Sequence, residues 1–175
     1  MAPNDLLFRR ARSDDWPAIW PIFREVVAGG DTYAYLPDTP EPVARELWMQ
    51  PGANRRFTYV AESGDTIVAT AYLKPNAIGL GDHICNAGWM VAPSASRQGI
   101  GRRFAEYVIA EAEAFGFVGM QFNAVVSTNI RAIRLWQSMG FEIAGTIPDA
   151  FRHNSTGLTA IHVMYRSLAP QQDQP

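Results

Sequence analysis

Two glycines stand where an expected strand gives way to an expected helix. Gly99 and Gly101 are separated by one residue, and they follow an apolar run that ends at Val91. The first turn of a helix has unpaired N–H groups and the positive end of the helix dipole, so it attracts phosphate. Glycine lets the backbone approach a ligand closely, and Arg97 and Arg102 add positive charge. The segment therefore predicts a site for a phosphate-containing ligand.

The two glycines alone favour a simpler interpretation, in which they serve only the turn. The loop lacks the Gly-Lys-Ser/Thr ending of a P-loop, and a dinucleotide-binding fingerprint needs three glycines. A second stretch lies about thirty residues downstream, where Asn129 leads into a helix-like run that ends in Gly140-Phe141. The combination of the two stretches is far more specific than either one.

Together the two stretches resemble the GNAT superfamily of acyl-CoA N-acyltransferases. The family's pyrophosphate loop has the form Arg/Gln-x-x-Gly-x-Gly/Ala. Its later helix carries Asn-x-x-Ala-x-x-Leu-Tyr and ends in a Gly-Phe turn. The matching residues are Gly99, Gly101, Asn129, Ala132, Leu135, Gly140 and Phe141. The order of the expected elements also agrees, so the resemblance covers most of residues 6–167.

The resemblance implies a fold and a co-substrate. The fold would be mixed α/β, with a twisted, mostly antiparallel sheet of six to seven strands, a splayed central pair and about four flanking helices. The co-substrate would be acetyl-CoA, and no metal is implied. The residues expected to bind acetyl-CoA are Met90, Val91, Ser96, Arg97, Gln98, Gly99, Ile100, Gly101, Arg102, Asn129, Ala132 and Trp136.

The end of the chain, residues 147–153 and the expected strand after them, is similar to a bacterial branch of the family that acetylates small amines. The resemblance thus implies an N-acetyltransferase acting on an amino acid or a similar compound. Tyr33 and Tyr35 would contact the acceptor, since the family closes this region over it, although they could equally be packing residues. Two alternatives are a non-catalytic acyl-CoA-binding module and a protein or peptide N-acetyltransferase.

Two positions depart from the family pattern. The first loop position, commonly Arg or Gln, is Ser96, and the position that is often a catalytic tyrosine is Trp136. A phenol can protonate the departing thiolate, whereas an indole N–H only donates a hydrogen bond. The thiolate would then be protonated by water or by another residue, such as Tyr33, Tyr35 or Tyr72.

The expected reaction is direct attack of a neutral amine on a thioester. By resemblance, backbone groups of the strand ending at Met90 and Val91 would hold the pantetheine arm and polarise the thioester carbonyl. We expect water-relayed deprotonation of the amine near His83 or His153. Cys85 reads as a small buried residue, because no covalent intermediate is required.

The expected elements come from hydrophobic periodicity and turn residues. Helices are expected from Trp16 to the Gly29-Gly30 stop and over Pro42–Met49, Gly99–Phe115 and Asn129–Met139. Strands are expected over Leu6–Arg10, Phe57–Glu62, Thr66–Leu73, Ile84–Val91, Gly119–Val125, Phe141–Thr146 and Thr159–Arg166. His153 would lie in a loop before the last strand.

Length and composition fit one domain over residues 1–168, with a polar, disordered tail at 169–175. The 175 residues are 47% hydrophobic and carry a formal net charge of -2, which does not indicate a nucleic-acid-binding protein. A single cysteine and no apolar run long enough to span a bilayer predict a cytoplasmic protein without a membrane partner. The exposed edges expected of such a sheet make a homodimer plausible.

Overall fold

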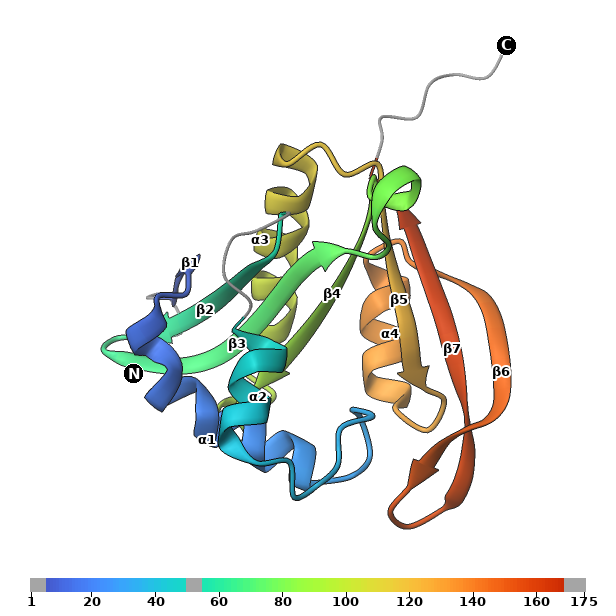
Figure 1. Ribbon diagram of the computed structural model, residues 1–175, viewed down its shortest axis with the longest axis horizontal. Helices are drawn as coiled ribbons and strands as arrows, with labels where there is room; N and C mark the ends of the chain where they lie inside the picture. The colour runs from blue at the N-terminus through green and yellow to red at the C-terminus, as the bar shows by residue number, and fades with distance from the viewer. Residues whose placement is uncertain (1–5, 50–54, 169–175) are drawn as a thin grey trace.

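The computed structural model describes residues 6–49 and 55–168, and within these ranges seven strands form one sheet (Figure 1). The strand order is β1-β2-β3-β4-β5-β7-β6, and every neighbouring pair is antiparallel except β4 with β5. The strands are β1 (Leu6–Arg10), β2 (Phe57–Ser63), β3 (Thr66–Pro75), β4 (Ile84–Val91), β5 (Gly119–Val126), β6 (Glu142–His153) and β7 (Gly157–Ser167). The α-helices are α1 (Trp16–Ala28), α2 (Glu41–Trp48), α3 (Ile100–Ala114) and α4 (Ile130–Ser138). The expected fold class is confirmed, while the expected tail at 169–175 lies outside the described residues.

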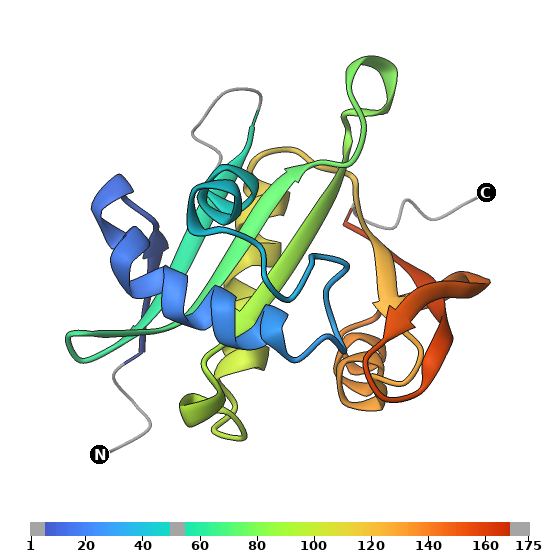
Figure 2. The same ribbon diagram turned by 60° about the horizontal axis from the view of Figure 1, so that its bottom comes forward.

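Helices cover both faces of the sheet. Helices α1 and α2 pack on one face and α3 and α4 on the other (Figure 2). Strand β4 serves both layers because successive side chains of a strand point to opposite faces. Cys85 and Ala87 join the cluster that includes α3 and α4, whereas Met90 joins the cluster that includes α1 and α2. Side chains of β4 can therefore reach a ligand from either side of the sheet.

Strands β4 and β5 are paired over only a short stretch. Ile84 lies opposite Gly119 and Cys85 opposite Met120, and beyond these pairs the two strands diverge (Figure 1). At the start of the divergence, the Asn86 side-chain amide donates to the Gln121 carbonyl at 2.8 Å, where a backbone partner is missing. The central sheet is thus splayed, as the resemblance implies, and its splay opens towards the end of β4 that precedes α3.

The last hairpin is longer than the sequence predicts. The strand expected over Phe141–Thr146 starts at Glu142 and continues to His153, so the predicted loop containing His153 is wrong. Register shifts between Ile143 and Gly145 and between Ile147 and Phe151 let β6 stay paired with β7 past its polar residues. Such irregularities interrupt the alternation of apolar and polar residues that marks a strand in a sequence.

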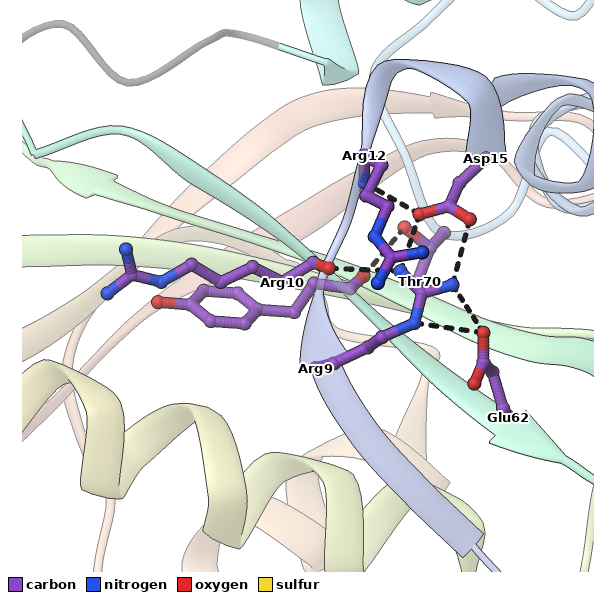
Figure 3. A network of polar contacts seen from close by, with 7 residues as sticks. Arg9, Arg10, Arg12, Asp15, Glu62 and Thr70 are labelled. Atoms are coloured by element: carbon purple, nitrogen blue, oxygen red, sulfur yellow. Dashed lines mark hydrogen bonds and ion pairs between the residues drawn. The ribbon is translucent and has the colours of Figure 1, made fainter.

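A polar network ties the start of α1 to the first two strands (Figure 3). The Arg9 guanidinium donates to both carboxylate oxygens of Asp15 at 2.7 and 2.8 Å and also contacts Glu62 on β2. The backbone N–H of Arg12 donates to Asp15 at 2.6 Å. Arg9 lowers the pKa of Asp15 mainly through these side-chain hydrogen bonds. The network fixes the point at which the chain leaves β1 for the helix.

Replacing Asp15 with asparagine should lower the free energy of unfolding by about 1–3 kcal/mol at neutral pH, because it removes charge-assisted hydrogen bonds. The depressed pKa makes this stabilisation present above the unfolded-state pKa of about 3.9 and lost as the pH falls through the folded-state value. Urea unfolding of both proteins between about pH 7 and pH 2 checks this. The exposed neighbour Asp14 supplies the control variant Asp14→Asn. A stability difference that does not shrink in acid would contradict the assignment.

Strand β6 forms one edge of the sheet, and most of its residues are exposed. An exposed edge strand is open to pairing with another chain, and the homodimer stays a prediction. Among the described helices, none is both long and apolar enough to cross a bilayer.

Candidate active site

A pocket of about 470 Å³ passes through the sheet where β4 and β5 separate. Its walls come from both strands, from β3, from α1 and the segment that follows it, and from α4 with its N-cap residue. The lining residues are Val26, Thr32, Tyr33, Ala34, Tyr35, Tyr72, Lys74, Asn86, Ala87, Gly88, Trp89, Met90, Val91, Phe122, Asn123, Ala124, Val125, Val126, Asn129, Ala132 and Trp136. The pocket therefore has one wall on each face of the sheet.

The wall on the α3 and α4 face is aromatic. The Trp136 ring lies 4.8 Å from those of Trp89 and Phe122, and 5.8 Å from that of Phe141, between ring centroids. The Trp89 Nε1 is buried without a hydrogen-bond partner. Trp136 thus forms part of an aromatic wall of the pocket, and its indole N–H can donate a hydrogen bond but cannot supply a proton.

The wall on the α1 and α2 face carries three phenols. Tyr33 and Tyr35 stack with ring centroids 5.8 Å apart, and the Tyr33 hydroxyl donates to the Trp89 carbonyl at 2.9 Å. The Tyr72 hydroxyl donates to Asn86 Oδ1 at 3.0 Å. Burial raises the pKa of all three phenols above the ordinary value, so they keep their protons at neutral pH. The two tyrosines predicted to contact the acceptor therefore lie in the pocket, and the structure adds Tyr72 beside them.

The β4 backbone is accessible along the splay. Its β3-facing edge is paired as far as Val91, whereas β5 pairs with it only at Ile84 and Cys85. Gly88 leaves no room for a side chain, because a Cβ atom there would lie 2.7 Å from Tyr72 Cε1 and 3.1 Å from the Tyr33 hydroxyl. Met90 and Val91, the residues predicted to present backbone groups to the thioester, both line the pocket.

The glycine loop follows directly from this end of β4. Gly99 has a φ of 75° and Arg97 a φ of 65°, both in the left-handed region, and Gly99 is the N-cap of α3. A Cβ atom on Gly99 would meet nothing within 4 Å, and one on Gly101 would come no closer than 3.8 Å to Val91. The backbone at the start of this 15-residue helix is therefore open to a phosphate-sized group. The residues present fit a pyrophosphate.

The other predicted cofactor residues occupy different positions around this end of the sheet. Arg97 and Gln98 are exposed, Ser96 is half-buried, and Arg102 contacts Ser138 and Glu106. Ile100 packs into the core. Asn129 caps α4, where its Oδ1 accepts from the Ala132 N–H at 3.1 Å, and both residues line the pocket with Trp136. Asn129, Ala132 and Trp136 therefore line the pocket together with Met90 and Val91, whereas the predicted cofactor residues of the loop, 96–102, do not line it.

The two histidines predicted to lie near the reacting amine, His83 and His153, are not among the residues that line the pocket. His83 is exposed in the turn before β4, at the end where β4 and β5 are still paired. His153 ends β6 and its Nδ1 lies 3.2 Å from Ser155 Oγ. Neither lines the pocket, so its geometry gives no support to the hypothesis that a histidine relays the amine proton.

Sequence reasoning missed the polar residues on β3, β4 and β5. Lys74, Asn86 and Asn123 all line the pocket. One signal was present, because Asn86 interrupts the otherwise apolar run of Ile84–Val91. A buried amide in such a strand needs partners, and the partners come from residues distant in sequence.

Comparison with known proteins gives a consistent result. Residues 16–141 match the sequence model described as the acetyltransferase (GNAT) family. A GCN5-related N-acetyltransferase from Kribbella flavida is 44% identical with a TM-score of 0.90, over 95% of this chain and 99% of that one.

Of two further relatives, one matches a shorter part of this chain and the other has a lower sequence identity. The N-acetyltransferase aca1 of Schizosaccharomyces pombe is 44% identical over 87 residues, which are 50% of this chain and only 42% of that protein. The yncA protein of Salmonella typhimurium, solved with its cofactor acetyl-CoA, is 20% identical with a TM-score of 0.79, over 98% of this chain and 99% of that one. At this identity the likeness concerns the fold alone.

Proposed function

Because this chain belongs to the acetyltransferase (GNAT) family, we propose that it transfers an acetyl group from acetyl-CoA to the primary amine of a small molecule, an amino acid or a similar compound. The observation that carries the proposal is the pocket through the splayed β4 and β5. It offers the β4 backbone to a ligand from one side of the sheet and a polar chamber from the other. Two substrates can therefore meet at one point from opposite faces.

The cofactor half of the site would be built from backbone and aromatic groups. The amides at the start of α3 would hold the pyrophosphate of acetyl-CoA, with Gly99 and Gly101 allowing close approach. Trp136 and the splayed edge of β4 would line the pantetheine arm. When bound, acetyl-CoA supplies the activated acetyl thioester. Ser96 in place of Arg or Gln would be tolerated in this arrangement, because backbone N–H groups would supply most of the donors.

The chain's own groups are suited to direct transfer. Backbone groups of Met90 and Val91 on the free edge of β4 would polarise the thioester carbonyl. Cys85 is no candidate nucleophile, since its side chain is fully buried, lies 3.4 Å from the Gly119 carbonyl, and has its pKa raised by burial to about 12. Attack by the acceptor amine itself accounts for the site without an acyl-enzyme.

Proton transfer would pass through water and hydroxyl groups. The pocket lining within residues 6–49 and 55–168 includes no histidine, aspartate or glutamate. The protonated phenols of Tyr33, Tyr35 and Tyr72 lie on the acceptor side of the pocket. We propose that a neutral amine enters from solvent and that its nitrogen attacks the thioester carbonyl. As the C–N bond forms and the C–S bond breaks, water would take one proton from the nitrogen, and water or a phenol would return a proton to the departing sulfur.

The test is amine-dependent release of the CoA thiol, together with the mass of the acetylated product. Purified protein should release thiol from acetyl-CoA faster with some small primary amines than with buffer alone. A parallel set of peptides with free N-termini separates small-molecule from protein acetylation. If no amine or peptide accelerates thiol release while acetyl-CoA still binds, the chain is a binding module and the proposal is wrong.

A further inference from the structure

Lys74 occupies an unusual position in this chain. It is the only lysine of the sequence, beside fourteen arginines that make up the rest of the 15 basic residues. It lies on β3 opposite Asn86 of β4, and it projects on the same face as Tyr72, two residues earlier. It lines the pocket from the α1 and α2 side.

Among the described residues that line the pocket, Lys74 is the only charged one. Its ammonium lies 5.3 Å from the centroid of the Tyr72 ring, and no ion pair joins it to a carboxylate in the described parts of the chain. Burial lowers the pKa of Lys74, and the nearby Arg56 lowers it further. A half-buried cation without a counter-charge is costly, so an anionic ligand would gain from meeting it.

The side-chain amides near Lys74 are already hydrogen-bonded within the protein. Asn86 receives a hydrogen bond from Tyr72 and donates to the Gln121 carbonyl. Gln121 Nε2 donates to Asn123 Oδ1 at 2.8 Å, and Asn123 Nδ2 donates to Asn76 Oδ1 at 2.7 Å. These hydrogen bonds hold the side-chain amides in place on one side of the pocket. The Lys74 ammonium has three N–H donors, and it can offer them to a ligand.

We infer that Lys74 binds the carboxylate of the acceptor, so that the substrate is an amino acid and not a simple alkylamine. This inference rests on the proposed acetyl transfer. Gly88 lies two residues beyond Asn86 on β4, which is about 7 Å along the strand. A small zwitterion can therefore place its carboxylate at Lys74 and its amine near the free backbone of β4.

The same charge assists the reaction. A positive charge close to the acceptor's ammonium group disfavours that charged form, so it lowers the ammonium pKa and increases the neutral fraction that can attack. It also repels acceptors that carry a second cation in place of a carboxylate. Lys74 would thus select the substrate and help to prepare its amine.

The first experiment compares small α-amino acids with their primary amides. Glycine, alanine, serine and methionine, each beside its amide, would be assayed for CoA thiol release with wild type, Lys74→Gln and the control Arg24→Gln. Arg24 is exposed on α1, and its guanidinium lies 6.0 Å from the Trp20 ring centroid. The ammonium group of an amino-acid amide is more acidic than that of the free amino acid, so the amide has the larger fraction of neutral amine at a given pH. A difference in that fraction would therefore favour the amides and cannot explain a preference for the acids.

Wild type should prefer acids over amides by roughly 10- to 100-fold in kcat/KM, the range of one hydrogen bond to a charged group. Lys74→Gln should collapse this ratio towards one through a higher KM for the acids, and Arg24→Gln should keep it. A fall of kcat that is equal for acids and amides would assign Lys74 to proton transfer and overturn the inference. Turnover of amines with an unchanged ratio would overturn it as well, while leaving the acetyltransferase proposal intact.

A second measurement does not depend on turnover. Reductive methylation with ¹³C-formaldehyde labels only Lys74 and the α-amino group, because there is no other lysine. In the presence of CoA, the Lys74 methyl resonance should shift saturably with N-acetylglycine and not with N-acetylglycinamide. The α-amino resonance serves as the internal control. A Lys74 resonance unaffected by any of the four N-acetyl amino acids of the panel would overturn the inference even if no amine is turned over.

Discussion

Replacing Gly88 with alanine should reduce kcat/KM for acetyl transfer by about two orders of magnitude while sparing acetyl-CoA binding. The new methyl group would lie 2.7 Å from Tyr72 Cε1 and 3.1 Å from the Tyr33 hydroxyl, so both rings must move. The Tyr72 hydroxyl donates a hydrogen bond to Asn86 Oδ1, and the Tyr33 hydroxyl donates one to the Trp89 carbonyl. Displacement of positioning groups by about 1 Å commonly costs about 10²-fold in rate.

The stability of the Gly88→Ala protein should also fall, by about 1–3 kcal/mol, which is typical of overpacking. The matched control is Gly145→Ala on β6, where a Cβ atom would meet nothing within 4 Å. Steady-state kinetics and urea unfolding of the two variants separate the local effect from a general cost of removing glycine. Wild-type kinetics in Gly88→Ala would show that the two tyrosines do not shape the acceptor site.

Replacing Trp136 with alanine should cost about 3–5 kcal/mol of stability, because it removes a large buried ring from the core. Trp136 is 9% exposed and contacts the rings of Trp89, Phe122 and Phe141. The loss is a large share of the roughly 5–15 kcal/mol that holds a typical domain together. The same substitution removes a wall of the pocket, so acetyl-CoA affinity should fall as well.

Trp136→Phe supplies the control for this prediction. Phenylalanine keeps an aromatic surface against Phe122 while removing the indole N–H, so most of the stability and of the acetyl-CoA affinity should remain. The urea midpoint and the acetyl-CoA dissociation constant of each variant are the measurements. If Trp136→Phe loses catalysis while keeping affinity, the indole N–H has a role in the reaction that packing does not explain.

The parts of the site formed by neighbouring residues could be predicted from the sequence. Gly99 and Gly101 lie within one turn at the start of α3, and Asn129 caps the helix that follows it. Strand β4 was predicted with the bounds that the structure shows. Local chemistry determines these features, so a linear pattern is enough to reveal them.

The side of the pocket that we propose for the acceptor could not be predicted in this way, because it depends on the register of strand pairing. Lys74 faces Asn86 only through the antiparallel pairing of β3 with β4, and Asn86 reaches Gln121 only where β5 runs beside it. The position of His83 outside the pocket could not be predicted for a related reason. Its place just before β4 does not reveal that the sheet opens at the opposite end of that strand.

The most direct test of the account is the unfolding temperature of the protein with and without acetyl-CoA, beside adenine-only and desulfo controls. A ligand at about 100 times its Kd should add about 2.7 kcal/mol of stability, or about 5–10 °C for a chain of this size. Desulfo-CoA should give most of this shift, and adenosine little of it, if the loop at Gly99 and the splay at β4 bind the pyrophosphate and pantetheine arm. No shift at millimolar acetyl-CoA would contradict the account, because the splayed strands would then not form a cofactor site.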